Sequence, residues 1–152
     1  MNDWKKILIG VDTTPTSNQG VEYVARIAGG LPGVRMCLLH VYPEPPPDYY
    51  TGGGTLEGYR RDQEKKAEQL MEECDAILKQ AGVNSNAITH EIRMAEQKTI
   101  SETILACQQE GGFGTLVVGR RGVSKAEEFL FGSISSALIH HAKQCTVWVV
   151  SQ

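Results

Sequence analysis

The sequence predicts one α/β domain, residues 1–152, in which a parallel sheet carries helices on both faces. Apolar stretches alternate four times with segments of helical periodicity, and a last apolar run closes the chain. Most of these runs are short and nearly continuous, as in parallel strands that are buried on both faces. A chain of 152 residues is also the usual size of one domain. These observations predict a three-layer sandwich with right-handed crossovers.

The first strand–helix unit has clear boundaries. Residues 5–12, Lys-Lys-Ile-Leu-Ile-Gly-Val-Asp, are predicted to form a central buried strand. Thr14 suits a helix N-cap, and Pro15 suits the first helical position. The apolar face at residues 21–28 then predicts a helix that ends at Gly29-Gly30.

The second unit contains the longest segment without a predicted element. A buried strand over residues 34–42 ends at Pro43, because proline lacks the N–H that a ladder needs. Residues 43–55 are rich in proline and glycine and are predicted to be irregular, with a mobile surface excursion favoured over a dedicated lid. The strongest helical periodicity follows and ends at Gly82.

The second half of the chain repeats the alternation. Residues 87–94 alternate between apolar and polar types, which predicts a strand near a sheet edge. A capping box that begins at Thr99 starts the next helix. A buried strand over residues 115–118 leads into a glycine-rich stretch, and residues 134–142 and 146–151 form the final helix and strand.

Composition excludes several classes of protein. The hydrophobic share of 41%, the charged share of 22% and the net charge of −3 suit a globular protein and do not favour a general nucleic-acid binder. No apolar run approaches the ~20 residues that a membrane span needs, and the first residues lack a signal peptide's apolar region. Cys37, Cys74, Cys107 and Cys145 form no C-x-x-C pair, so buried thiols in a reducing cytoplasm are expected.

The stretch after residues 115–118 has the features of a phosphate cradle. Gly119-Arg120-Arg121-Gly122 is followed, nine residues later, by Gly132-Ser133 at a predicted helix start. Free N–H groups and the helix dipole favour an anion at such a start. Arg120, Arg121 and Lys125 add positive charge, which places Lys125 among the candidate binding residues.

The other polar side chains that could serve a site are Asp12 and the four histidines. Ligands of parallel sheets bind beyond the carboxyl ends of the strands, where Asp12 lies. Asp12 can hold a divalent cation or a ribose hydroxyl, or it can cap the first helix, and the local sequence favours neither. His40 is predicted to be a hydrogen-bonded core histidine, and His90 a surface residue. His140 and His141 diverge by about 100° on a helix. No catalytic residue is predicted.

Three common sites are missing from the sequence. It contains no Walker G-x-x-x-x-G-K-[ST] motif, which counts against a P-loop ATPase. Its first strand–helix turn lacks G-x-G-x-x-G, which counts against a Rossmann dinucleotide site. It also has no G-x-S-x-G elbow of a serine hydrolase.

The glycine spacing resembles the nucleotide-binding motif of the universal stress protein family. The first strand with Asp12, the segment Leu39-His40-Val41 and the closing helix and strand resemble that family too, so the resemblance covers essentially the whole chain. It implies a five-stranded parallel sheet of order 3-2-1-4-5 in the adenine-nucleotide α-hydrolase-like class. It also implies binding of ATP, or of AMP or ADP, with magnesium or manganese.

The resemblance implies a set of binding residues. Asp12, the tentative metal ligand, and the adjoining Gly10, Val11, Thr13 and Thr14 would approach the ribose and phosphates. Val41 would contact adenine through its backbone. The residues implied around the ribose and triphosphate are Gly119, Arg120, Arg121, Gly122, Gly132, Ser133 and Ile134.

Three positions depart from the family pattern. The first turn reads Asp-Thr-Thr-Pro instead of Asp-Gly-Ser, and Arg120 replaces a small hydroxyl residue. Cys145-Thr146 stands where Cys-Pro is common, which leaves an extra N–H donor in the closing strand. Family members commonly dimerise by pairing closing strands, here from Thr146 to Ser151, whose apolar edge would otherwise be unprotected.

The expected function is therefore that of a cytoplasmic, ATP-binding stress-response protein that acts as a homodimeric sensor or regulator. Any hydrolysis would be slow, because no residue is an evident base for activating water. A metal-dependent nucleotide hydrolase or phosphotransferase is the main alternative. A flavodoxin-like carrier, suggested by the hydroxyl-rich residues 13–17, and a nucleotide-free interaction module are further alternatives.

Overall fold

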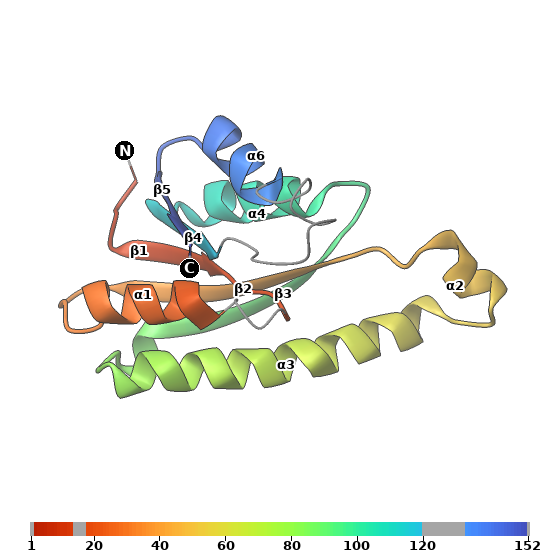
Figure 1. The fold of residues 1–152 in the computed structure, drawn as a ribbon, viewed down its shortest axis with the longest axis horizontal. Helices are drawn as coiled ribbons and strands as arrows, with labels where there is room; N and C mark the ends of the chain where they lie inside the picture. Colours follow the sequence, from red (N-terminus) through yellow and green to blue (C-terminus); the bar gives the residue numbers. More distant parts are fainter. Residues whose placement is uncertain (1, 14–17, 120–132, 152) are drawn as a thin grey trace.

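Five parallel strands form one sheet in the order β3-β2-β1-β4-β5, as the resemblance implied (Figure 1). This computed structural model describes residues 2–13, 18–119 and 133–151. The strands are β1 (Lys6–Gly10), β2 (Arg35–Pro43), β3 (Ile88–Ala95), β4 (Thr115–Gly119) and β5 (Thr146–Val150). The helices are α1 (Asn18–Ala28), α2 (Pro47–Thr51), α3 (Leu56–Gln80), α4 (Ile100–Gly111) and α6 (Ser133–His141), with a 3₁₀ turn at Ser85–Ala87.

Helices cover both faces of the sheet, which confirms the predicted three-layer sandwich (Figure 1). On one face, α1 and α3 pack onto a core that includes the fully buried Ile7, Ile9 and Leu38. On the other face, α4 and α6 pack onto a core that includes Leu8 and Leu116. The alternating faces of β1 therefore enter different cores, as expected for a central strand.

The predicted start of α4 is confirmed by a hydrogen bond. The Thr99 side chain caps α4 by accepting from the Glu102 N–H at 3.1 Å. Gly112 ends α4 in the left-handed region, with φ of 65°. β3 is an edge strand, as its alternation predicted. The strand β1 is shorter than the predicted residues 5–12, although the Val11 N–H still bonds the Leu39 carbonyl at 2.8 Å.

Residues 43–55 are not irregular throughout, which corrects the prediction. The short helix α2 occupies Pro47–Thr51, with Pro47 at its first position and Asp48 in its first turn. Thr55 caps α3 through the Gly58 N–H at 3.0 Å. α2 and the first turns of α3 extend beyond the sheet (Figure 1), and residues 43–59 are called the arm below. The helix start predicted at Thr14 and Pro15 lies outside the described residues.

Cysteines and histidines lie largely as predicted. Cys37, Cys74 and Cys107 are free and buried, and Cys145 is free and half-buried. His40 is buried and hydrogen-bonded, whereas His90, His140 and His141 are exposed. Within the described part of the chain, no helix is both long enough and apolar enough to cross a membrane.

Candidate functional site

The chain reverses its direction of travel across the sheet between β1 and β4. From β1 it proceeds outward through β2 to β3, and it then returns to the other side of β1 as β4. Gly10 at the end of β1 is in register with Leu39 on one side and with Val118 on the other. Ligands of open parallel sheets bind at the carboxyl edge next to such a switch in strand order. The topology therefore places the candidate site beyond β1, β2 and β4.

The exit of the chain from β1 is held against β2 by two hydrogen bonds. The Val11 N–H donates to the Leu39 carbonyl at 2.8 Å. The Val11 carbonyl accepts from Nδ1 of the buried His40 at 2.9 Å. Asp12 follows as a half-buried residue, and Thr13 is exposed. The Asp12 carboxyl group is thereby attached to a fixed segment of backbone at the switch point.

The β4 side of the edge is approached closely by α1. A Cβ atom added at Gly20 of α1 would lie 3.6 Å from the backbone nitrogen of Gly119 at the end of β4. The space around Gly10 is tighter, because a Cβ there would lie 3.1 Å from Cγ1 of Val118. Gly10 thus lets the ends of β1 and β4 pack closely before Asp12, whereas a Cβ at Gly20 would make an ordinary contact.

The structure brings part of the predicted set together. Gly10, Val11, Asp12 and Thr13 lie at the end of β1, Val41 is buried near the end of β2, and Gly119 ends β4. Ser133 begins α6, and the half-buried Ile134 packs on the core beneath α4 and α6. The remaining predicted residues, Thr14, Arg120, Arg121, Gly122, Lys125 and Gly132, lie outside the described residues.

In the described part of the edge, the Asp12 carboxylate follows buried apolar residues. Val11, the residue after β1, and Val41 of β2 are both buried. In the described ranges, no group of three or more His, Cys, Asp or Glu residues could hold a metal ion. A cation at Asp12 would need further oxygen ligands from a bound phosphate and water, which is how Mg²⁺ is usually held.

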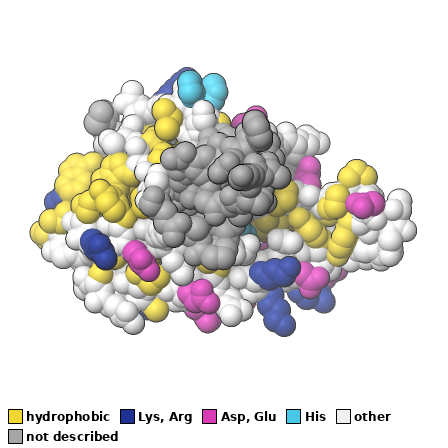
Figure 2. All heavy atoms as spheres, in the orientation of Figure 1, with side chains coloured by type: hydrophobic (Ala, Val, Ile, Leu, Met, Phe, Trp, Pro, Cys, Tyr) yellow, Lys and Arg dark blue, Asp and Glu magenta, His cyan; other side chains and the backbone are white. Residues whose placement is uncertain are grey.

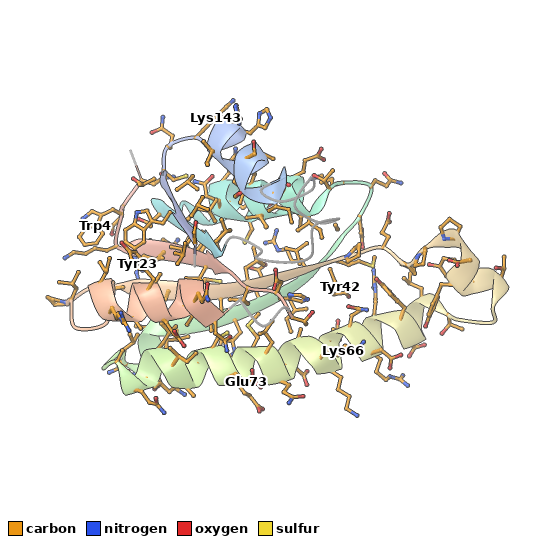
Figure 3. All side chains as sticks on the ribbon, viewed as in Figure 1. Trp4, Tyr23, Tyr42, Lys66, Glu73 and Lys143 are labelled. Carbon is orange, nitrogen blue, oxygen red and sulfur yellow. The ribbon has the colours of Figure 1, made fainter. Side chains whose placement is uncertain are left out.

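Three tyrosines that follow no pattern in the sequence connect this edge to the arm. Tyr42 contacts His40 on one side and Tyr59 on the other, with ring centroids 6.5 and 5.9 Å apart. Tyr49 packs against Tyr59 with a centroid separation of 5.3 Å. Tyr42, labelled in Figure 3, is buried, and burial raises its pKa, so its hydroxyl stays neutral.

The sequence contains a signal for the helix α2 of the arm but none for its aromatic contacts. Pro47 followed by Asp48 is a helix-start pattern, because proline suits the first position and an acid suits the first turn. The aromatic contacts span residues 40–59 and have no helical or strand period. No local pattern could have predicted them.

Comparison with known proteins identifies the family. The model of the universal stress protein family matches residues 3–151, which is nearly the whole chain. The chain belongs to the universal stress protein family. This membership confirms the resemblance that the glycine spacing and strand sequences indicated.

Individual members of the universal stress protein family are distant in sequence. A universal stress protein of Mycobacterium tuberculosis is 28% identical over 151 residues, which cover 90% of this chain and 45% of that protein. One of Mycolicibacterium smegmatis is 25% identical over 136 residues, with the same coverage. The chain thus spans about half the length of these curated relatives.

Solved universal stress proteins share the fold along nearly the whole chain. The universal stress protein UspA of Lactobacillus plantarum has a TM-score of 0.76 at 18% identity, covering 99% of both chains. A universal stress protein solved in complex with cAMP has a TM-score of 0.67 at 17% identity and 97% coverage of both. One from Archaeoglobus fulgidus, in complex with dAMP, has a TM-score of 0.62 at 18% identity and 98% coverage of both.

Proposed function

We propose that this chain binds an adenine nucleotide, with ATP as the expected ligand, and acts as a stress-response sensor or regulator. The observation that carries the proposal is the switch point between β1 and β4, where Asp12 leaves one strand and the glycine-spaced stretch leaves the other. Similar structures in complex with cAMP and dAMP support an adenine ligand. A cytoplasmic location suits the buried free thiols.

Each part of the edge has a proposed role. Backbone groups near Val41 would recognise adenine, and the half-buried Asp12 would bind the ribose or a Mg²⁺ or Mn²⁺ ion held by the phosphates. The positive charges of Arg120, Arg121 and Lys125 would offset the phosphate charge. Ser133, at the start of α6, brings a helix N-terminus to the same stretch of chain, and such an end favours an anion.

Turnover of the nucleotide is proposed to be slow. A hydrolase needs a base that orients or deprotonates water. His40 is buried, and its Nδ1 already bonds the Val11 carbonyl. The alternative, a metal-dependent hydrolase or phosphotransferase, requires that product release exceed a protein-free control and that Asp12→Ala abolish it.

We also propose that two copies pair through β5. The strand lies at an edge of the sheet, and residues 147–150 are half-buried although three are valines and one is tryptophan. An exposed aromatic side chain lies beside it, since Tyr23 of α1 is 44% exposed and its ring centroid is 6.1 Å from that of Trp148 in β5. Figure 2 shows hydrophobic side chains gathered at the left, in the part of the view where Figure 3 places Trp4 and Tyr23. Pairing would cover an edge that otherwise invites aggregation.

Calorimetric titration with ATP and Mg²⁺ tests the binding proposal. We expect a dissociation constant in the micromolar range, about −8 kcal/mol, and its loss in Gly122→Val or Gly132→Val. The matched control is Gly30→Val, because a Cβ at Gly30 meets nothing within 4 Å. Gly30 also lies before β2, at the opposite edge of the sheet. A wild-type protein with no nucleotide affinity, and with no small molecule detected by mass spectrometry after purification, would refute the proposal.

A further inference from the structure

One buried side chain links two strands at the candidate site. His40 belongs to β2 and is 7% exposed, and its Nδ1 lies 2.9 Å from the Val11 carbonyl oxygen. A carbonyl can only accept, so Nδ1 carries the hydrogen and donates it. The two residues are 29 positions apart, so this bond ties separate parts of the chain.

The backbone of Val11 needs this bond because β1 ends one residue earlier. The sheet ladder of β1 covers Lys6–Gly10, and beyond it the Val11 N–H bonds the Leu39 carbonyl at 2.8 Å. The His40 ring satisfies the carbonyl of the same residue. Val11 is 5% exposed, so without the ring this carbonyl would have little access to water. An unpaired buried carbonyl is costly, and the segment would shift to find another partner.

The consequence falls on Asp12, which is the next residue. The Val11 N–H belongs to the peptide group before its Cα, and the Val11 carbonyl belongs to the peptide group that joins it to Asp12. The two bonds hold one group each, and the orientation of the second, planar group sets the direction in which Asp12 leaves. His40 also directly precedes Val41, the proposed adenine contact. One imidazole therefore fixes the relative position of the two strand ends on which the proposed site is built.

We propose that His40 is a positioning residue of the nucleotide site, which holds the Val11–Asp12 peptide group so that Asp12 faces the ligand. This inference rests on the proposed function for its effect on affinity. The clamp itself is a property of the protein without ligand. A histidine that merely filled space in the core would be replaceable by an apolar residue without effect on the nucleotide.

Three variants test the inference by calorimetry with ATP and Mg²⁺, at a temperature where circular dichroism shows each to be folded. His40→Leu removes the donor with little change in volume, and we expect affinity to fall by about tenfold or more. His40→Asn keeps a nitrogen donor near the position of Nδ1 and should stay within about threefold of wild type. His90→Leu removes an exposed histidine of β3 and should bind as wild type does.

Amide hydrogen exchange without nucleotide provides an independent readout. We expect His40→Leu to speed exchange at Asp12 and Thr13, and His40→Asn to restore the wild-type rate. Unchanged exchange in His40→Leu would overturn the clamp, whatever the nucleotide result. If the wild type binds nucleotide and His40→Leu binds it equally well, the positioning role is overturned but the proposed function is not. A wild type that binds no nucleotide would overturn the proposed function and, with it, this role of His40.

Discussion

At the scale of single residues, the buried thiols of Cys74 and Cys107 have strongly raised pKa values. Burial raises the pKa of Cys74 to about 12, from an ordinary value of 9.0. Burial also raises the pKa of Cys107 to about 12, with the nearby Glu91 carboxylate adding to the effect. Both thiols are at most 1% exposed. They are therefore expected to be unreactive in the native protein.

The raised pKa values of these thiols predict that the free energy of unfolding falls at alkaline pH. Above pH 9 the unfolded chain releases thiol protons that the folded protein retains, so the free energy of unfolding decreases as pH rises from 9 towards 12. Each thiol contributes a slope of at most about 1.4 kcal/mol per pH unit. Urea unfolding in the presence of a reductant should show a shallower slope for Cys107→Ala than for wild type. Equal slopes would contradict this explanation.

Residues whose partner is close in sequence could be predicted, and those with distant partners could not. The Thr99 cap joins groups three positions apart and was expected from the local pattern. His40 was expected to be buried and hydrogen-bonded, but nothing near it in the sequence indicated Val11 as its partner. The side chains of residues 120–132, which hold most of the predicted cradle, lie outside the described residues, so their role stays a prediction.

At the scale of elements, the arm has its own small core. Tyr59 packs edge to face against Tyr49 of the arm and against Tyr42 of β2, and its hydroxyl donates to the Pro43 carbonyl at 2.6 Å. An Arg60–Glu96 ion pair of 3.0 Å joins α3 to the loop after β3. Proline and glycine content alone predicted an irregular excursion. It missed this core because aromatic contacts between strand, short helix and long helix leave no periodic pattern.

The Tyr59 hydrogen bond can be tested by removing one oxygen. Tyr59→Phe keeps the ring contacts but leaves the Pro43 carbonyl without this donor, so we expect the free energy of unfolding to fall by about 1 kcal/mol. The matched control is Tyr50→Phe, because Tyr50 is 48% exposed and its change should have no measurable effect. Urea denaturation measures both. If the two variants were equally stable, the hydroxyl would not stabilise the arm.

At the scale of the whole molecule, strand order could not be obtained from periodicity. The alternation of strands and helices predicts a parallel sheet, but the reversal that puts β4 beside β1 came from the family resemblance. The edge position of β5 bears on the proposed dimer. The Thr146 N–H, the extra donor relative to a Cys-Pro sequence, bonds the Gly114 carbonyl of the neighbouring segment at 3.0 Å. It is therefore used within the chain and does not remain for a partner.

Alternation along β5 identifies which groups face outward. Since Thr146 points its backbone groups towards β4, Val147 and Val149 point theirs towards the open edge. Val149→Pro should remove an outward donor without breaking a bond to β4, and we expect it to be monomeric by light scattering. Val149→Thr should stay dimeric. A wild type that is monomeric at micromolar concentration would contradict the proposed dimer.

The central claim is that an adenine nucleotide binds at the carboxyl ends of β1, β2 and β4. The most direct test is an NMR titration of the isotope-labelled protein with ATP and Mg²⁺. We predict saturable shifts that are concentrated at the amides of Val11, Asp12, Val41, Gly119 and Ile134, with the amino-edge residues Gly30 and Gly112 unchanged. No saturable shifts, or shifts confined to the arm or to the amino edge, would contradict the claim.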